Sequence, residues 1–131
     1  MWLPACDSIV LVPVPQHVSK TYSRGFNQSV LLCRWLQPAL GATVRPLLKK
    51  VRATDAQAHA PDRSQRQKNL ADSMRASGTA DPNALYIVVD DVITTGSTIA
   101  EAGRALRAAG AVHVYGMALA HGYAAKRSAS R

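Results

Sequence analysis

Apolar residues occur along this chain in short runs, separated by segments in which they recur at helical spacing. Three runs rich in branched side chains predict buried strands at Ser8–Val14, Tyr86–Val89 and Val112–Leu119. A fourth run, Thr43–Leu48, predicts a weaker strand. These runs are too short for helices, so the first expectation is a sheet built from strands that are far apart in the sequence.

Two segments carry apolar residues at helical spacing. The first runs from Phe26 to Leu40, with Asn27 as its predicted N-cap and Pro38 and Gly41 closing it. The second runs from Thr98 to Ala109, where small and aliphatic residues share one face. In that segment Thr98 is followed three residues later by Glu101, which matches a capping box.

The middle of the chain has weaker signals. Lys49–Ala60 shows no periodicity and predicts a loop, whereas Pro61–Met74 is compatible with a helix that begins at a proline. Ser77–Asn83 is rich in turn residues. Residues 124–131 are predicted to form a frayed basic tail, which leaves residues 1–123 as one domain.

The order of these elements predicts an α/β fold. A strand, a helix and a strand between residues 86 and 119 form a βαβ unit, which predicts a parallel sheet flanked by helices. In such sheets ligands bind beyond the carboxyl ends of the strands. We therefore expect the functional site in the loops after Val14, Val89 and Leu119.

Composition narrows the class of protein. The chain has 131 residues, of which 47% are hydrophobic, so one globular domain is expected and a disordered chain is excluded. No apolar stretch approaches the roughly 18 residues of a membrane-spanning helix, and no secretory signal is expected. The two cysteines, Cys6 and Cys33, cannot make a disulfide framework or a zinc site by themselves. A reducing, cytoplasmic location is the expectation.

The net charge of +8 is concentrated in one part of the sequence. Residues 20–75 hold eleven Lys and Arg side chains but only three Asp residues. This excess favours an anionic partner, such as a polyphosphate ligand, a nucleic acid or an acidic protein, although a solubilising surface remains the alternative. Aromatic residues are only 5% of the chain, a poor supply of stacking platforms for single-stranded DNA.

The segment from Val88 to Thr98 carries the clearest chemistry. Asp90 and Asp91 follow an apolar strand, and a run of small residues, Thr94–Thr98, then leads into a helix. Free N–H groups, hydroxyls and a helix N-terminus converge there on one anion, and Gly96 permits close backbone approach or a positive φ. The two carboxylates suit vicinal hydroxyls or a hydrated Mg²⁺ ion. Together they describe a site for a ribose 5-phosphate; a plain helix-capping turn is the alternative.

Two other phosphate motifs are absent from the sequence. There is no G-x-x-x-x-G-K-[ST] and no G-x-G-x-x-G, which argues against an NTPase and a dinucleotide oxidoreductase.

The Val88–Thr98 segment resembles the PRPP-binding motif of type I phosphoribosyltransferases. The resemblance implies the type I phosphoribosyltransferase fold, with PRPP ribose bound by Asp90 and Asp91 and Mg²⁺ held indirectly by the same pair. It also implies a set of residues that wraps the 5-phosphate. These are Thr94, Thr95, Gly96, Ser97 and Thr98.

Further segments resemble the ComF/GntX branch, the competence-protein-F-like predicted phosphoribosyltransferases that are linked to DNA uptake. The segments that carry this resemblance are Val12–Pro15, Arg24–Gln28, Thr54 with Gln57, and Arg66 with Asn69. The family usually has an N-terminal zinc module with four cysteines, which this sequence lacks, so no zinc is expected.

The resemblance implies roles outside the phosphate loop. Arg24 and Gly25 would meet the pyrophosphate, and residues 49–68 would form a flexible hood. The hood residues would be Gln57, Arg66 and Asn69. His121 and Tyr123 would border an acceptor pocket, with a fraying C-terminus as the alternative.

The function that this implies is transfer of a phosphoribosyl group from PRPP with release of pyrophosphate. No catalytic base is assigned. Two alternatives stay open: a non-enzymatic adaptor that contacts single-stranded DNA or DNA-uptake proteins, and a PRPP-sensing module. The oligomeric state is not predicted.

Overall fold

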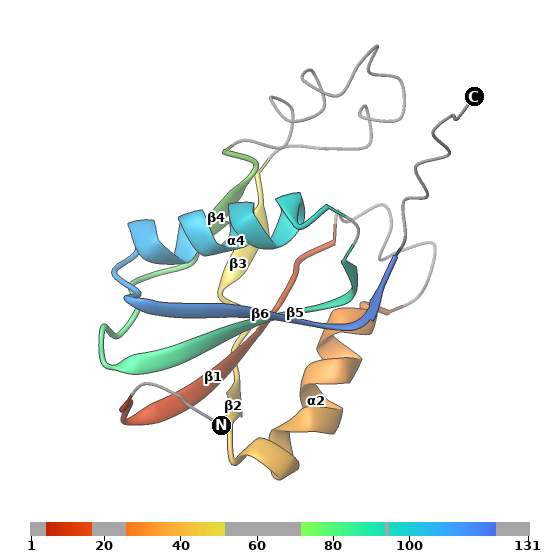
Figure 1. Cartoon of the computed structure of the whole chain (residues 1–131). Coiled ribbons are helices and arrows are strands. Elements are labelled where there is room, and N and C mark those ends of the chain that lie inside the picture. The colour runs from red at the N-terminus through yellow and green to blue at the C-terminus, as the bar shows by residue number, and fades with distance from the viewer. Residues whose placement is uncertain (1–4, 17–25, 52–71, 94, 123–131) are drawn as a thin grey trace, which may run out of the picture.

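The structure is a computed structural model that describes residues 5–16, 26–51, 72–93 and 95–122. Its centre is a parallel sheet of four strands in the order β2-β1-β5-β6 (Figure 1). The strands are β1 (Ser8–Pro13), β2 (Thr43–Val44), β5 (Ala84–Ile93) and β6 (His113–His121). The predicted α/β architecture is therefore confirmed.

One helix covers each face of the sheet (Figure 1). Alternate side chains of β1 and β5 pack against α4 (Ser97–Ala108), and the residues between them pack against α2 (Gln28–Leu40). For example, Val12 and Val88 lie in the α4 layer, whereas Leu11 and Ile87 lie in the α2 layer. Because β1 and β5 are buried on both faces, their sequences are continuously apolar rather than alternating.

The N-cap prediction for α2 is confirmed. Asn27 Oδ1 accepts a hydrogen bond from the Ser29 N–H (2.8 Å), and its Nδ2 donates to the Val14 carbonyl (3.1 Å). Gly41 ends the helix in the left-handed region (φ 60°). The prediction that Pro38 also closes the segment is wrong, because Pro38 lies inside the last turn. Phe26 precedes the helix and is exposed, so it is not part of the apolar stripe.

A second, antiparallel pair of strands packs on α4: β3 (Leu48–Lys50) with β4 (Met74–Ala76). The predicted single strand Thr43–Leu48 is wrong, because Pro46 has no N–H to continue the ladder and the chain changes sheets there. The predicted loop Lys49–Ala60 begins as a strand, and Met74 is in β4 rather than in a helix. The rest of these two segments, residues 52–71, lies outside the described residues.

The predicted capping box of α4 is wrong. The helix begins at Ser97 after Gly96, which has a φ of 85°, and no side chain caps it. Glu101 is buried and instead accepts a hydrogen bond from the Met74 N–H (2.9 Å) on β4. Because Glu101 packs against β4, its carboxylate bonds there and not to the N-terminus of α4 as the local pattern predicted.

Two strands differ from the prediction in extent or position. Strand β5 continues beyond Val89 to Ile93 because β6 pairs with it over that stretch, so Asp90 and Asp91 lie within a strand rather than after it. Strand β6 is the outer strand of the sheet and is only partly buried, so the expectation of a core strand at Val112–Leu119 is wrong. In the described parts of the chain, no helix is both long and apolar enough to cross a bilayer.

Candidate functional site

The candidate site lies where β5 extends past its neighbour β1. The ladder between these strands ends with the hydrogen bond from the Val14 N–H to the Val89 carbonyl (3.0 Å). On the other side of β5, pairing with β6 continues to Ile93 and His121. The last four residues of β5 are therefore a ledge at the carboxyl edge of the sheet, the position at which parallel sheets bind ligands.

Asp90 and Asp91 lie at the start of this ledge, and their carboxylates turn back on the backbone. The Asp91 N–H donates to Asp90 Oδ1 (2.8 Å), and the Val92 N–H donates to Asp91 Oδ1 (2.9 Å). Burial raises the pKa of the Asp90 carboxyl from its ordinary 3.8 to about 6, and its hydrogen bond with the Asp91 carboxyl adds to this rise. The positive charge of Lys50 acts in the opposite direction.

The turn between β5 and α4 encloses a small hollow. Thr95 Oγ1 donates to Ser97 Oγ (2.9 Å) and accepts from the Ser97 N–H (3.2 Å), which tightens the turn. The hollow has a volume of about 30 Å³. It is lined by Asp90, Val92, Ile93 and Thr95–Ile99. Gly96 has the positive φ that was predicted as one of its two possible roles, and it leaves open space where a Cβ would stand.

A larger and mostly apolar groove adjoins the ledge on the α2 side. Its volume is about 530 Å³, and Asp91 and Val92 form its end near the carboxyl edge. Helix α2 contributes Leu31 and Trp35, and β6 contributes Leu119. The two acidic residues thus border different hollows, Asp90 the small polar one and Asp91 the apolar one, as consecutive positions of a strand should.

The donor set at the ledge fits Mg²⁺ held jointly with a ligand. Mg²⁺ prefers oxygen donors and usually takes one or two carboxylates together with water and substrate phosphates. Asp90 and Asp91 would supply those carboxylates. The described residues contain no cluster of three or more His, Cys, Asp or Glu that would hold a metal by themselves. The remaining positions would therefore be filled by ligand oxygens and water.

Comparison with curated proteins finds several relatives. The chain is 41% identical to the DNA utilization protein YhgH of Salmonella typhi over 113 residues, which is 86% of this chain and 48% of the relative. It is 37% identical to competence protein F of Haemophilus influenzae over 115 residues, 84% of this chain and 50% of the relative. It is 38% identical to YhgH of Escherichia coli K12 over 112 residues, 82% and 46% of the two chains.

The chain belongs to the ComF family. This agrees with the resemblance seen in the sequence. The ComF-family chain spans about half the length of the curated relatives that it matches. No family model matches it.

The structure describes only part of the site that the sequence predicted for this ComF-family chain. Asp90, Asp91, Thr95, Gly96, Ser97 and Thr98 are brought together at one edge of the sheet. His121 lies at the same edge, exposed, at the end of β6 and paired with Ile93. The other predicted site residues lie outside the described residues. They are Arg24, Gly25, Gln57, Arg66, Asn69, Thr94 and Tyr123.

Two residues near the site have places that the sequence did not predict: Lys50, which was expected only as part of the hood at residues 49–68, and Gln16. Lys50, at the end of β3, is close enough for its charge to act on the Asp90 carboxyl. The basic pair Lys49–Lys50 is evident in the sequence, but no local pattern predicts that β3 brings Lys50 near the carboxyl edge of the larger sheet. Gln16 follows β1, and its Oε1 is buried without a hydrogen-bond partner among the described residues.

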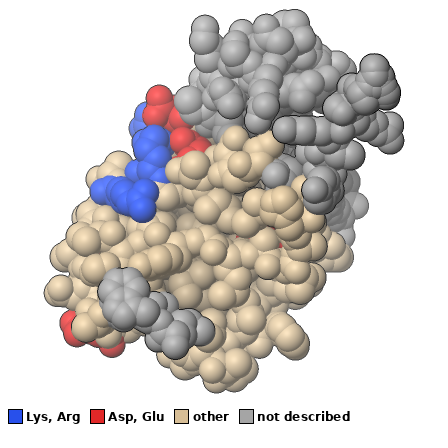
Figure 2. Space-filling view, in the orientation of Figure 1, with Lys and Arg blue, Asp and Glu red and all other residues tan. Residues whose placement is uncertain are grey.

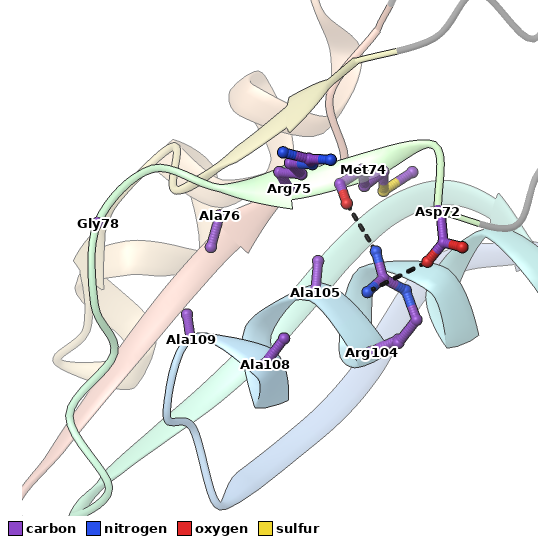
Figure 3. A pocket seen from close by; sticks show the side chains of 9 residues that line it. All are labelled: Asp72, Met74, Arg75, Ala76, Gly78, Arg104, Ala105, Ala108 and Ala109. Atoms are coloured by element: carbon purple, nitrogen blue, oxygen red, sulfur yellow. Dashed lines mark hydrogen bonds and ion pairs between the residues drawn. The ribbon is translucent and has the colours of Figure 1, made fainter.

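A third hollow of the ComF-family chain lies between β4 and α4, away from the ledge (Figure 3). Its volume is about 460 Å³, and alanines of α4 form much of its wall. Arg104 turns toward Met74 and Asp72, donating to the Met74 carbonyl (2.7 Å) and lying 3.5 Å from Asp72 Oδ1. Figure 2 shows basic and acidic side chains side by side on this part of the surface. Arg104 thus joins β4 to α4 and has its charge balanced within the protein.

Proposed function

We propose that this ComF-family chain binds PRPP together with Mg²⁺ at the ledge and transfers its phosphoribosyl group to an acceptor, releasing pyrophosphate. The observation that supports this most is the joining of two features at one edge: a turn of small residues at a helix N-terminus, and a half-buried carboxylate, Asp90, beside it. A phosphate needs the first feature and a ribose diol needs the second.

Each described part has a task in this proposal. The first turn of α4 and the hydroxyls of Thr95, Ser97 and Thr98 would bind the 5-phosphate. Asp90 and Asp91 would accept hydrogen bonds from the ribose hydroxyls and share Mg²⁺ with the ligand. When bound, Mg²⁺ would neutralise charge on the pyrophosphate. The bond between C1 and the pyrophosphate oxygen breaks as the acceptor bonds to C1, so orientation and charge stabilisation are the main requirements.

The first test measures PRPP affinity by calorimetry with and without Mg²⁺. We expect binding to need Mg²⁺ and the double variant Asp90→Asn, Asp91→Asn to bind at least tenfold more weakly, a loss of about 1.4 kcal/mol or more. Asp7→Asn removes an exposed carboxyl near the opposite edge of the sheet and should change nothing. Equal affinity of the double variant and the unchanged protein would contradict the proposal.

A matched pair of glycines refines this test. Gly96 and Gly78 both have a positive φ, and both leave open space where a Cβ would stand. Gly96→Val and Gly78→Val therefore introduce similar backbone strain, and only the first would crowd a bound phosphate. We expect PRPP binding to be abolished by Gly96→Val alone. Release of pyrophosphate on adding nucleobases then separates an enzyme from a PRPP sensor.

A second candidate function is a role in DNA utilisation through contact with DNA. The curated relatives are named DNA utilization protein and competence protein, and the sequence has a strong basic excess between residues 20 and 75. This function is compatible with PRPP binding, because the basic segment and the ledge are different parts of the chain.

A further inference from the structure

Strand β6 is an outer strand, and within the described residues it has none of the devices that usually protect such an edge. It is nine residues long, from His113 to His121, and contains no Lys, Arg, Asp, Glu or Pro. Figure 2 shows few charged side chains in this view, apart from the group over α4 and β4 and a small acidic patch at the lower left. Long uncharged edges readily pair with another strand, so this edge is suited to a partner.

The backbone direction of β6 defines which groups such a partner would meet. The Gly122 N–H donates inward to the Ile93 carbonyl (2.7 Å) on β5. Because N–H and C=O groups alternate sides along a strand, the even positions of β6 face β5 and the odd positions face outward. The residues with outward backbone groups are His113, Tyr115, Met117, Leu119 and His121. Among the described residues β6 neighbours only β5 in the sheet, so these outward backbone groups meet no described strand.

We propose that a second copy of this chain pairs with β6 in antiparallel orientation, about a two-fold axis at Met117. In this register each outward residue meets another outward residue, Tyr115 opposite Leu119 and His113 opposite His121, so all the outward donors and acceptors are matched. The two copies then form one continuous sheet of eight strands. Overlap of the whole strand favours this register over shifted ones.

The side chains around this edge support the same partner. Met117 packs in the α2 layer of the core, so the odd side chains of β6 lie on the α2 side of the sheet. On that side Tyr115 is 45% exposed, Leu119 73% and Trp35 of α2 73%. Tyr115 of the second copy would lie beside Leu119, at the outer wall of the apolar groove, where it would cover both Leu119 and Trp35.

The surface that this pairing would bury is close to that of a standard specific interface. A fully covered aromatic side chain removes roughly 150–250 Å² from water. The exposed parts of Tyr115, Leu119, Trp35 and Leu31, with nine residues of strand edge, provide on the order of 600–800 Å² per copy. A standard specific interface buries about 800 Å² per partner. Strand β6 itself has no Lys, Arg, Asp or Glu that would repel an identical strand.

The first experiment measures self-association by sedimentation velocity over a concentration series. We expect a monomer–dimer equilibrium that Leu119→Lys weakens at least tenfold, because a charge is placed on the shared edge. Val112→Lys is the matched control, since Val112 is exposed and apolar but precedes β6. A monomer at every concentration, or a dimer that Leu119→Lys leaves intact, would overturn the proposal.

A cysteine pair tests the register in a Cys6→Ser background, where the remaining Cys33 is fully buried. Met117→Cys faces its own copy across the axis at a Cα separation of about 5.5 Å and should form a disulfide-linked dimer under oxidation. Tyr115→Cys lies about 13 Å along the strand from its own copy and should not. Cross-linking of Tyr115→Cys but not Met117→Cys would overturn the register. Both variants retain the outward backbone groups.

Discussion

Asp90 and Glu101 are carboxyls whose surroundings move their pKa values in opposite directions. At Asp90, burial and the hydrogen bond with the Asp91 carboxyl raise the pKa to about 6. At Glu101, burial also raises the pKa, but hydrogen bonds from Arg104 and the Met74 N–H outweigh it, so the net pKa is lowered. Glu101 therefore has the hydrogen-bond donors that stabilise a buried carboxylate. The charged form of Asp90 is instead destabilised by burial, which is common for residues that contact ligands.

The raised pKa of Asp90 predicts a stability gain in Asp90→Asn. The folded state binds the extra proton between pH 3.8 and about 6, so the contribution of this residue to stability falls as pH rises through that window. Asn copies the neutral carboxyl and can still accept the Asp91 N–H. We expect Asp90→Asn to unfold at higher urea concentration than the unchanged protein at pH 7.5, with no difference at pH 3.5.

The control for this measurement is Asp7→Asn, which alters an exposed carboxyl. If Asp90→Asn were destabilising at pH 7.5, the raised pKa would be the wrong description of the residue. The same variant is expected to weaken PRPP binding, so stability and ligand affinity should change in opposite directions.

At the scale of elements, the main finding is the connection between β4 and α4. Glu101 accepts from Arg104 Nε (2.9 Å) and from the Met74 N–H, and Arg104 donates to the Met74 carbonyl. Met74 is the register partner of Lys50 on β3. The two side chains therefore hold the small sheet on α4 and, through it, set the position of Lys50 near Asp90.

Glu101→Gln should weaken this connection. The substitution keeps an acceptor for the Met74 N–H but loses the charged bonds to Arg104, at a cost of about 1–2 kcal/mol in unfolding free energy at pH 7. Because the Glu101 pKa is lowered in the folded state, the loss should shrink as pH falls below the ordinary value of 4.5. Urea unfolding at pH 7 and pH 3.5 measures both effects.

Arg107→Gln provides the matched control, because Arg107 is an exposed basic residue on the same helix. A Glu101→Gln variant as stable as Arg107→Gln at pH 7 would show that the connection contributes nothing to folding.

At the scale of the whole molecule, most of the excess positive charge lies outside the residues that the structure describes. The described residues hold seven of the sixteen Lys and Arg side chains and six of the eight Asp and Glu side chains. Most of the net charge of +8 therefore belongs to segments outside the described residues: +2 in residues 17–25, +2 in residues 52–71 and +3 in residues 123–131. The described α/β unit is close to neutral, and any broad electrostatic attraction must come from the other segments.

If the cations between Lys49 and Lys68 contact DNA, binding should fall steeply with salt. Neutralising two of these cations, as in Lys49→Gln with Lys68→Gln, should reduce the slope of log affinity against log salt by about 1.4–1.8. Arg34→Gln with Arg45→Gln removes the same charge from exposed positions of the fold and should leave the slope unchanged. A gel-shift series from low to high salt measures this. Absence of a shift at low salt would remove DNA contact as a function.

Features that depend on neighbours in the sequence could be predicted. The apolar runs located β1, β5 and β6, helical spacing located α2 and α4, and Asn27 and Gly41 were recognised as the ends of α2. The acids near the end of β5 and the small residues after it predicted the candidate site, and separate segments such as Arg24–Gln28 predicted the ComF family. All of these follow from local preferences, that is, the period of the side chains, the capping hydrogen bond and the freedom of glycine at positive φ.

Features that depend on distant pairing required the tertiary structure. Strand β5 runs through Asp90 and Asp91 only because β6 pairs with it there. Lys50 lies where its charge acts on the Asp90 carboxyl because β3 pairs with β4. Glu101 matched a capping box but bonds to Met74, 27 residues away in the sequence. The outer position of β6 is likewise a property of strand order. Burial and hydrogen bonding between remote segments outweigh local preference at these positions, because each involves more buried area and more bonds than a single helix end can offer.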